Sequence, residues 1–525
     1  MATFFTFFHL PRELRHIIYQ LYVVSDGGYV LNPETNKLRD ALGRPIDLAF
    51  AYTCKRAADE MRGLALEANT ITVSTFYSPD ERHRARDFDL VTMMLNEELE
   101  NALHCSQHLL WDDTCDDISG AFPEFTPVLD MIRHDSWGIS TRQGPWGEPH
   151  SVYRDFVRFA LRAILSTNDR HRLNDDFTEL SYNINDTQHL LDMEPNPWTI
   201  PRQHDLRQIM DALGGKHSIR KFGLERFWMG SECARRAMFR YSAAAVAIRF
   251  LESNTPATRA HMRDIVLIED QESVSNPECH AMGLIPYCQE NPELRIERRV
   301  SLWRNAFFHL PGQALGVRTH QDYNLGLDAN KISYAVARWV IEVLPLVPAG
   351  MPAKSFTLVL DGEGEPQCSE IFQTVVLRDA AWQQAMEECF QSGALPSEPY
   401  GMRRNTQRTP LLDFPAFNDC YLFDKFPQVM QEIVDGTSIV RCNFGTGDFV
   451  DTEPFKLVAK KGLWSVDHWR FHWYERQKKT YQPSPPLPSW SDIKSSYLSD
   501  RHVAFTPSLT EMMSSSSAPQ GLRWQ

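Results

Sequence analysis

The chain has 525 residues, of which 42% are hydrophobic and 11% aromatic, so it is long enough for two or three structural units with substantial cores. Its 54 basic and 68 acidic residues give a formal net charge of −14, which argues against a surface that binds phosphate backbones or anionic lipid over its whole extent. The sequence shows no positively charged leader and no long apolar run, and its ten cysteines are irregularly spaced. These features predict a cytoplasmic or nuclear protein without a membrane partner.

An amphipathic helix is predicted near the N-terminus, in the stretch FHLPRELRHIIYQLY. Its apolar residues recur at the spacing of one helical face. They are Leu10, Leu14, Ile17, Ile18 and Leu21. Pro11 suits the first helical turn, and Glu13 suits the positive end of the helix dipole. The opposite face carries Arg12, Arg15, His16 and Gln20.

A second helix, followed by a strand, is predicted in IDLAFAYTCKRAADEMRGLALEANTITVSTF. The apolar residues of this helix are Leu48, Ala51, Tyr52, Ala58, Met61 and Leu64. The segment NTITVSTF then changes to the alternation typical of a strand. Two helices this short cannot bury their apolar faces alone, so they must pack on each other, on the strand or on a partner.

The rest of the chain has helical stretches followed by short alternating segments. A helix at 152–166 precedes TELSYNIN, SAAAVAIRFL precedes RDIVLIED, and ISYAVARWVIEVL precedes KSFTLVLDG. This pattern predicts an α/β or α+β fold without a short-period repeat. We expect a small helical N-terminal region at 1–76, an irregular mixed body of helices and strands at 77–505, and a disordered C-terminal tail at 506–525, where MMSSSSAPQG cannot form a core.

The N-terminal region resembles a known family of interaction modules. The pattern LPxEL at 10–14, followed by Ile18, resembles the start of an F-box, and TCKR at 53–56 resembles its later element. With NT at 69–70, the region is closer still to the F-box-like N-termini of uncharacterised fungal proteins. SVSNPECHAMGLIPYCQENPELRIERRVSLWRN is similar to a stretch of the same group. The sequence departs from the F-box pattern at Arg15, where an apolar residue is usual, and in the long turn-rich link between the helices.

The resemblance implies a protein–protein interaction protein, as a substrate-recognition subunit of a cullin-type ubiquitin ligase. A Skp-type adaptor would be bound by Leu10, Pro11, Leu14, Ile18 and Leu21. The body would bind an unknown protein substrate. This interpretation needs no cofactor and no catalytic residue in the chain. The other interpretation of the two N-terminal helices is that they pack on the core of the body.

The alternative function is a metal-dependent enzyme. In HCSQHLLWDDTCDD, His104 and His108 have the i, i+4 spacing that can hold a metal on a helix, with Asp112 and Cys115 nearby. The group Cys279, His280 and Cys288 lacks a paired CxxC motif, so we expect buried structural cysteines there.

Nucleic acid is not expected as a partner. The segment DHWRFHWYERQKK places His468 and His472 near several aromatic residues, with basic neighbours. Such a stripe could stack on bases. Aromatic residues at helical spacing are more often part of a core, and the chain as a whole is acidic.

Overall fold

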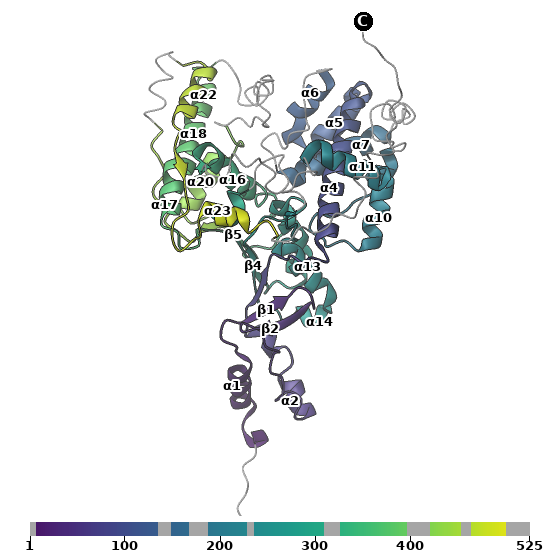
Figure 1. The fold of residues 1–525 in the computed structure, drawn as a ribbon, viewed down its shortest axis with the longest axis vertical. Coiled ribbons are helices and arrows are strands. Elements are labelled where there is room, and N and C mark those ends of the chain that lie inside the picture. The colour runs from purple at the N-terminus through teal and green to yellow at the C-terminus, as the bar shows by residue number, and fades with distance from the viewer. Residues whose placement is uncertain are drawn as a thin grey trace, which may run out of the picture.

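The computed structural model of the protein describes residues 7–134, 149–166, 187–227, 236–308, 326–395, 421–452 and 464–499. Helices surround a seven-stranded sheet in a mixed α/β fold (Figure 1). The predicted fold class is therefore confirmed. The predicted strand TELSYNIN and the predicted tail lie outside the described residues.

The main sheet is almost entirely parallel. Its strands are β1 (Tyr29–Asn32), β2 (Lys37–Asp40), β3 (Ile71–Ser74), β4 (Asp264–Glu269), β5 (Arg295–Ser301), β7 (Phe356–Asp361) and β8 (Val440–Cys442). Their order across the sheet is β2-β1-β3-β4-β5-β7-β8, and only the edge pair β1 and β2 is antiparallel. The parallel strands therefore follow one another in chain order. A separate small sheet pairs β6 (Leu327–Asp328) with β9 (Thr480–Tyr481).

Two groups of helices flank the sheet in Figure 1. The first lies between β3 and β4 in the chain and comprises α4 (Arg82–Cys105), α5 (Asp112–Ala121), α6 (Thr126–His134), α7 (His150–Leu165), α9 (Thr187–Asp192), α10 (Gln203–Ala212) and α11 (Gly215–Phe227). The second comprises α16 (Ala329–Ile341), α17 (Gln367–Ile371), α18 (Arg378–Gln391), α20 (Phe426–Val434), α22 (Val466–Glu475) and α23 (Trp490–Ser495). The short helices α14 (Pro256–Arg259) and α15 (Ile285–Glu290) lie next to β4 and β5 in the chain. In the described part of the chain, no helix has the length and apolarity required to cross a bilayer.

Side chains alternate between a buried and a partly exposed face of the sheet. In β4, for example, Ile265 and Leu267 are buried, whereas Val266 and Ile268 are partly exposed. The alanine-rich helix α13 (Ala243–Ser253) packs on β3 and β4, and its N-terminus is capped by the Ser242 hydroxyl, which accepts from the Ala245 N–H at 3.0 Å.

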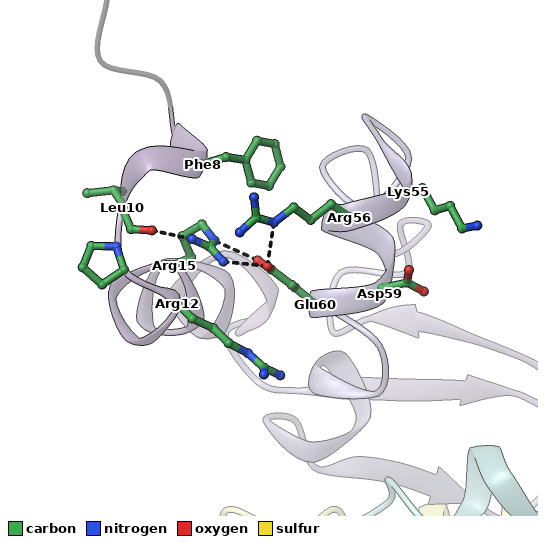
Figure 2. A pocket seen from close by; sticks show the side chains of 9 residues that line it. Phe8, Leu10, Arg12, Arg15, Lys55, Arg56, Asp59 and Glu60 are labelled. Atoms are coloured by element: carbon green, nitrogen blue, oxygen red, sulfur yellow. Dashed lines mark hydrogen bonds and ion pairs between the residues drawn. The ribbon is translucent and has the colours of Figure 1, made fainter.

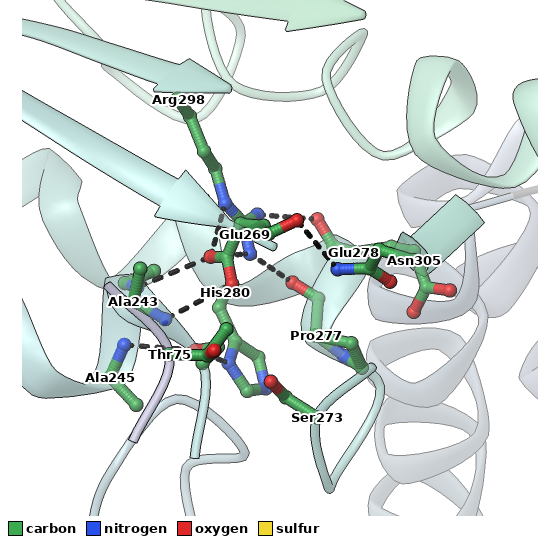
Figure 3. A network of polar contacts seen from close by, with 12 residues as sticks. Thr75, Ala243, Ala245, Glu269, Ser273, Pro277, Glu278, His280, Arg298 and Asn305 are labelled. Carbon is green, nitrogen blue, oxygen red and sulfur yellow. Dashed lines mark hydrogen bonds and ion pairs between the residues drawn. The ribbon is translucent and has the colours of Figure 1, made fainter. Parts of the chain in front are cut away.

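A buried ion pair joins β4, β5 and α13 (Figure 3). Arg298 donates to Glu269 Oε1 from Nε at 2.9 Å and from Nη2 at 2.6 Å, and neither side chain is more than 1% exposed. The same carboxylate accepts from the Ala243 and Ala244 N–H groups, at 3.0 and 3.2 Å, at the start of α13. Arg298 also donates to the Pro277 and Glu278 carbonyls. Because the partners of both charges are protein groups, this pair holds a helix on the sheet rather than a ligand.

His280 is also a structural group. Its Nε2 donates to the Ser275 carbonyl at 2.8 Å, so its Nδ1 accepts from the Ser242 hydroxyl at 2.7 Å. Burial lowers the pKa of His280 to about 3, so the ring is neutral. The thiols of Cys279 and Cys288 are buried, and burial raises their pKa. This agrees with the expected structural role of the cysteines.

Candidate functional site

The helix α1 (Arg12–Val23) presents two very different faces. The buried face consists of Arg15, Tyr19 and Val23, spaced four residues apart. Tyr19 and Val23 pack on Met61 and Leu64 in a small core that is separate from the main one. We call α1, α2 (Lys55–Glu60), α3 (Leu64–Glu67) and the loop at 46–54 the N-terminal lobe. Figure 1 shows α1 and α2 projecting from the sheet, away from the two helical groups.

The other apolar face of α1 is exposed to solvent. The exposed fractions are 47% for Leu14, 51% for Ile17, 39% for Ile18, 73% for Leu21 and 53% for Val24. Leu14, Ile18 and Leu21 of the predicted adaptor-binding set lie on this face, while Leu10 is half-buried and Pro11 is exposed at the start of the helix. Monomeric proteins seldom leave such a contiguous apolar patch in water, so this face is a candidate partner-binding surface.

Arg15, which the sequence places on the polar face, lies inside the lobe instead (Figure 2). Its Nε and Nη2 donate to the two oxygens of Glu60, at 2.8 and 2.6 Å, and its Nη1 donates to the Leu10 carbonyl. The Tyr19 hydroxyl and Arg56 Nε also donate to Glu60, each at 3.0 Å. The hydrogen bond from Arg15 is the main reason that the pKa of Glu60 is lowered to about 2. Arg15 therefore bridges α1 and α2.

The expected second helix is broken into two. Its predicted start at residues 48–53 forms turns, and Tyr52 is 82% exposed rather than part of a buried stripe. The helix begins only at Lys55, after Cys54, whose Sγ accepts from the Ala57 N–H at 3.4 Å. Gly63, with a φ of +79°, then separates α2 from α3. A side chain at Gly63 would collide with His261, so the break is also the place where the lobe meets the body.

The side chain of Asn69, in the Asn-Thr pair that ends the F-box-like pattern, has a structural role. Its side-chain amide donates to the Val23 and Ala65 carbonyls, both at 2.8 Å, and its oxygen accepts from the Ser25 N–H at 2.8 Å. One buried side chain thus joins the ends of α1 and α3 immediately before β3.

An open pocket lies between the start of α1 and α2 (Figure 2). It is lined by Phe8, Leu10, Pro11, Arg12, Arg15, Lys55, Arg56, Asp59 and Glu60. The Arg56 guanidinium lies 4.9 Å from the centre of the Phe8 ring, which is a cation–π geometry. The pocket adjoins the half-buried Leu10 at one end of the apolar face.

The metal site of the alternative interpretation does not form among the described residues. Helix α4 ends at Cys105, so His104 and His108 do not share a helix, and Asp112 starts α5, where it accepts from Arg133. In the residues that the structure describes, no three His, Cys, Asp or Glu side chains come together as a metal site. The i, i+4 interpretation was wrong because the helix ends between the two histidines.

The aromatic segment near the C-terminus belongs to a core. Trp469 and Trp473 of α22 are at most 2% exposed and pack against Trp382 of α18. Trp464 stacks on His472, with ring centres 4.3 Å apart. These rings are occupied by one another, so they do not form a platform for bases.

Comparison with known proteins gives no independent assignment. No protein-family model, no curated protein and no solved structure matches the chain. The argument for function therefore rests on the geometry of the lobe.

Proposed function

We propose that this chain is a protein–protein interaction protein whose N-terminal lobe binds a Skp-type adaptor of a cullin ubiquitin ligase. The observation that carries the proposal is the exposed apolar face of α1, formed by Leu14, Ile17, Ile18, Leu21 and Val24. Fully burying one such side chain contributes about 1.5–3 kcal/mol. Covering this face would therefore supply much of the free energy of binding.

The lobe is suited to docking because α1 is held firmly on its other side. The bond between Arg15 and Glu60 and the packing of Tyr19 fix the rotation of the helix about its own axis. A surface that is ordered before binding loses less conformational entropy when a partner arrives. Leu10 and Pro11 would extend the interface at the N-terminal end of α1.

The body offers a second surface, for the protein substrate. One face of the parallel sheet carries partly exposed side chains, among them Val266 and Ile268 of β4 and Arg299 of β5. The register aligns Ile268 of β4 with Arg299 of β5. This row combines apolar and charged groups, as protein-binding surfaces do.

The proposal is tested by titrating a purified Skp-type adaptor into the full chain by calorimetry. The double variant Leu14→Asp/Ile18→Asp should abolish binding. The matched control is His16→Asp/Gln20→Asp, which adds the same charge to exposed positions of the same helix. The control should keep the affinity of the unchanged chain. Adaptor binding that survives Leu14→Asp/Ile18→Asp, or no binding by the unchanged chain, contradicts the proposal.

A further inference from the structure

We infer that the lobe takes a partner helix that carries carboxylates beside its apolar stripe, and that the pocket between α1 and α2 binds those carboxylates. This inference rests on the proposed function and adds the chemistry of the partner. It starts from the position of the pocket, whose wall includes Leu10 and Pro11 at the end of the apolar face.

The two carboxylates in the pocket are already neutralised from within the lobe. Asp59 accepts from Arg62 at 2.7 Å. Glu60 is shared by Arg15 and Arg56. A cationic ligand would therefore find no free carboxylate in this pocket.

The pocket has more positively charged side chains than these two carboxylates can neutralise. In the described part of the chain, neither Arg12 nor Lys55 forms an ion pair, and both are exposed. The Arg56 side chain is 54% exposed although its Nε is bonded to Glu60, and its guanidinium lies between Glu60 and the Phe8 ring. Figure 2 shows Arg12 below the Arg15–Glu60 pair and Lys55 on the other side of α2, with its ammonium pointing outwards at the edge of the pocket.

The negative charge of the chain as a whole makes the local excess of cations at the pocket more selective for an acidic partner. The protein carries a formal net charge of −14, so an acidic segment is repelled by most of its surface. A local excess of cations beside an apolar stripe then directs such a segment to one place and one orientation. The occupant that fits both features is an amphipathic helix with acidic residues along one edge.

The experiment uses two stapled helical peptides with the same Leu/Ile face, one flanked by Glu and the other by Lys. Binding of each to the full chain is measured by fluorescence anisotropy at low and high salt. We expect the acidic peptide to bind about fivefold to tenfold more tightly at low salt, with the difference shrinking at high salt. The variant Arg12→Ala/Lys55→Ala should remove the preference. The control Lys37→Ala/Arg207→Ala removes two exposed cations elsewhere and should keep it.

Equal affinities, a preference for the basic peptide, or no binding by either peptide overturns the inference. So does a preference that Arg12→Ala/Lys55→Ala leaves intact. The adaptor titration decides the proposed function separately. If the chain prefers the acidic peptide but does not bind the adaptor, the proposed function is contradicted and the inference about the pocket stands. If the chain binds the adaptor but shows no preference for the acidic peptide, the proposed function stands and the inference is overturned.

Discussion

Arg15 and Glu60 lie 45 residues apart in the sequence, yet two hydrogen bonds join them in the interior of the lobe. The pair fixes which side of α1 is buried, and hence which side is left for a partner. An arginine is suitable here because its planar fork can bond both oxygens of one carboxylate and still reach the Leu10 carbonyl.

The substitution Glu60→Gln should destabilise α1, because the buried Arg15 would lose its charged partner. We expect a loss of α1 stability that exceeds the loss in the control variant, because a Gln amide cannot supply the charge that Arg15 bonds. Hydrogen exchange of the α1 amides measures it. The control Arg44→Gln breaks the pair with Asp40, in which Arg44 is 69% exposed, and should cost less than about 1 kcal/mol. Equal effects of the two variants would contradict a structural role for the buried pair.

The two faces of α1 should respond in opposite ways to truncation. Leu14→Ala should change the stability of the lobe by less than about 1 kcal/mol, because the side chain is 47% exposed. Tyr19→Ala should cost about 3–5 kcal/mol, because the ring is buried and its hydroxyl donates to Glu60. Hydrogen exchange of α1 reads out both variants. A large cost for Leu14→Ala would mean that this face packs on the body.

The stability of the sheet should depend far more on the buried Glu269–Arg298 pair than on the more exposed Glu297–Arg299 pair of β5. Glu269→Gln leaves the buried Arg298 without a carboxylate and should cost about 3–5 kcal/mol. Glu297→Gln removes the partner of the exposed Arg299 and should cost less than about 1 kcal/mol. Urea unfolding followed by tryptophan fluorescence distinguishes the two. Comparable midpoints for both variants would show that the buried pair is dispensable.

The carboxyl of Glu342 should contribute a loss of stability as pH rises from 4.5 to about 7. Burial raises the pKa of this carboxyl from 4.5 to about 7, although the Ser151 N–H and hydroxyl both donate to it. Its contribution is fully present below pH 4.5 and is lost as pH rises through 7, because the folded state binds the proton more tightly.

The isosteric variant Glu342→Gln should remove this pH dependence. Urea unfolding at several pH values should show a slope between pH 4.5 and 7 that is smaller by up to ~1.4 kcal/mol per pH unit. The surface variant Glu293→Gln should leave the slope unchanged. An unaltered slope in Glu342→Gln would show that the carboxyl is already ionised in the folded chain.

Deletion of residues 1–76 should yield an insoluble body. The deleted segment includes β1 and β3, and β3 is paired with β4 along its whole length. Its removal exposes an unpaired edge of β4, which promotes aggregation. Deletion of residues 1–11 spares all strands and should leave a soluble chain. Solubility and light scattering check both deletion variants, and a soluble, monomeric 77–525 fragment would show that the lobe and its strands are a separable module.

The elements that the sequence predicted well are those whose pattern matches their environment. Alternation in RDIVLIED and KSFTLVLDG gave β4 and β7, and the apolar stretches SAAAVAIRFL and ISYAVARWVIEVL gave α13 and α16. The strand β5 was missed because RIERRVS places Arg298 on the buried face. A strand with a buried arginine can be predicted only if the carboxylate that neutralises the arginine, here Glu269, is known to lie next to it.

The candidate site, too, could be predicted only in part from the sequence. Periodicity identified the apolar face of α1 correctly, since Leu14, Ile18 and Leu21 do lie together. It could not show that this face is exposed, because Arg15 and Tyr19 form a second contact face whose partner, Glu60, is distant in the sequence. The departure from the F-box pattern at Arg15, where an apolar residue is usual, was a local sign of that contact.

The parallel pairing of β3 with β4 also determines how the chain folds during synthesis. β3 ends at residue 74 and β4 begins at residue 264, so at 5–20 residues per second the ribosome needs roughly 10–40 s to supply the second strand. During that interval β1, β2 and β3 have emerged without their neighbour. Early folding of α4 and its partner helices would shield these strands from pairing with other chains during that interval.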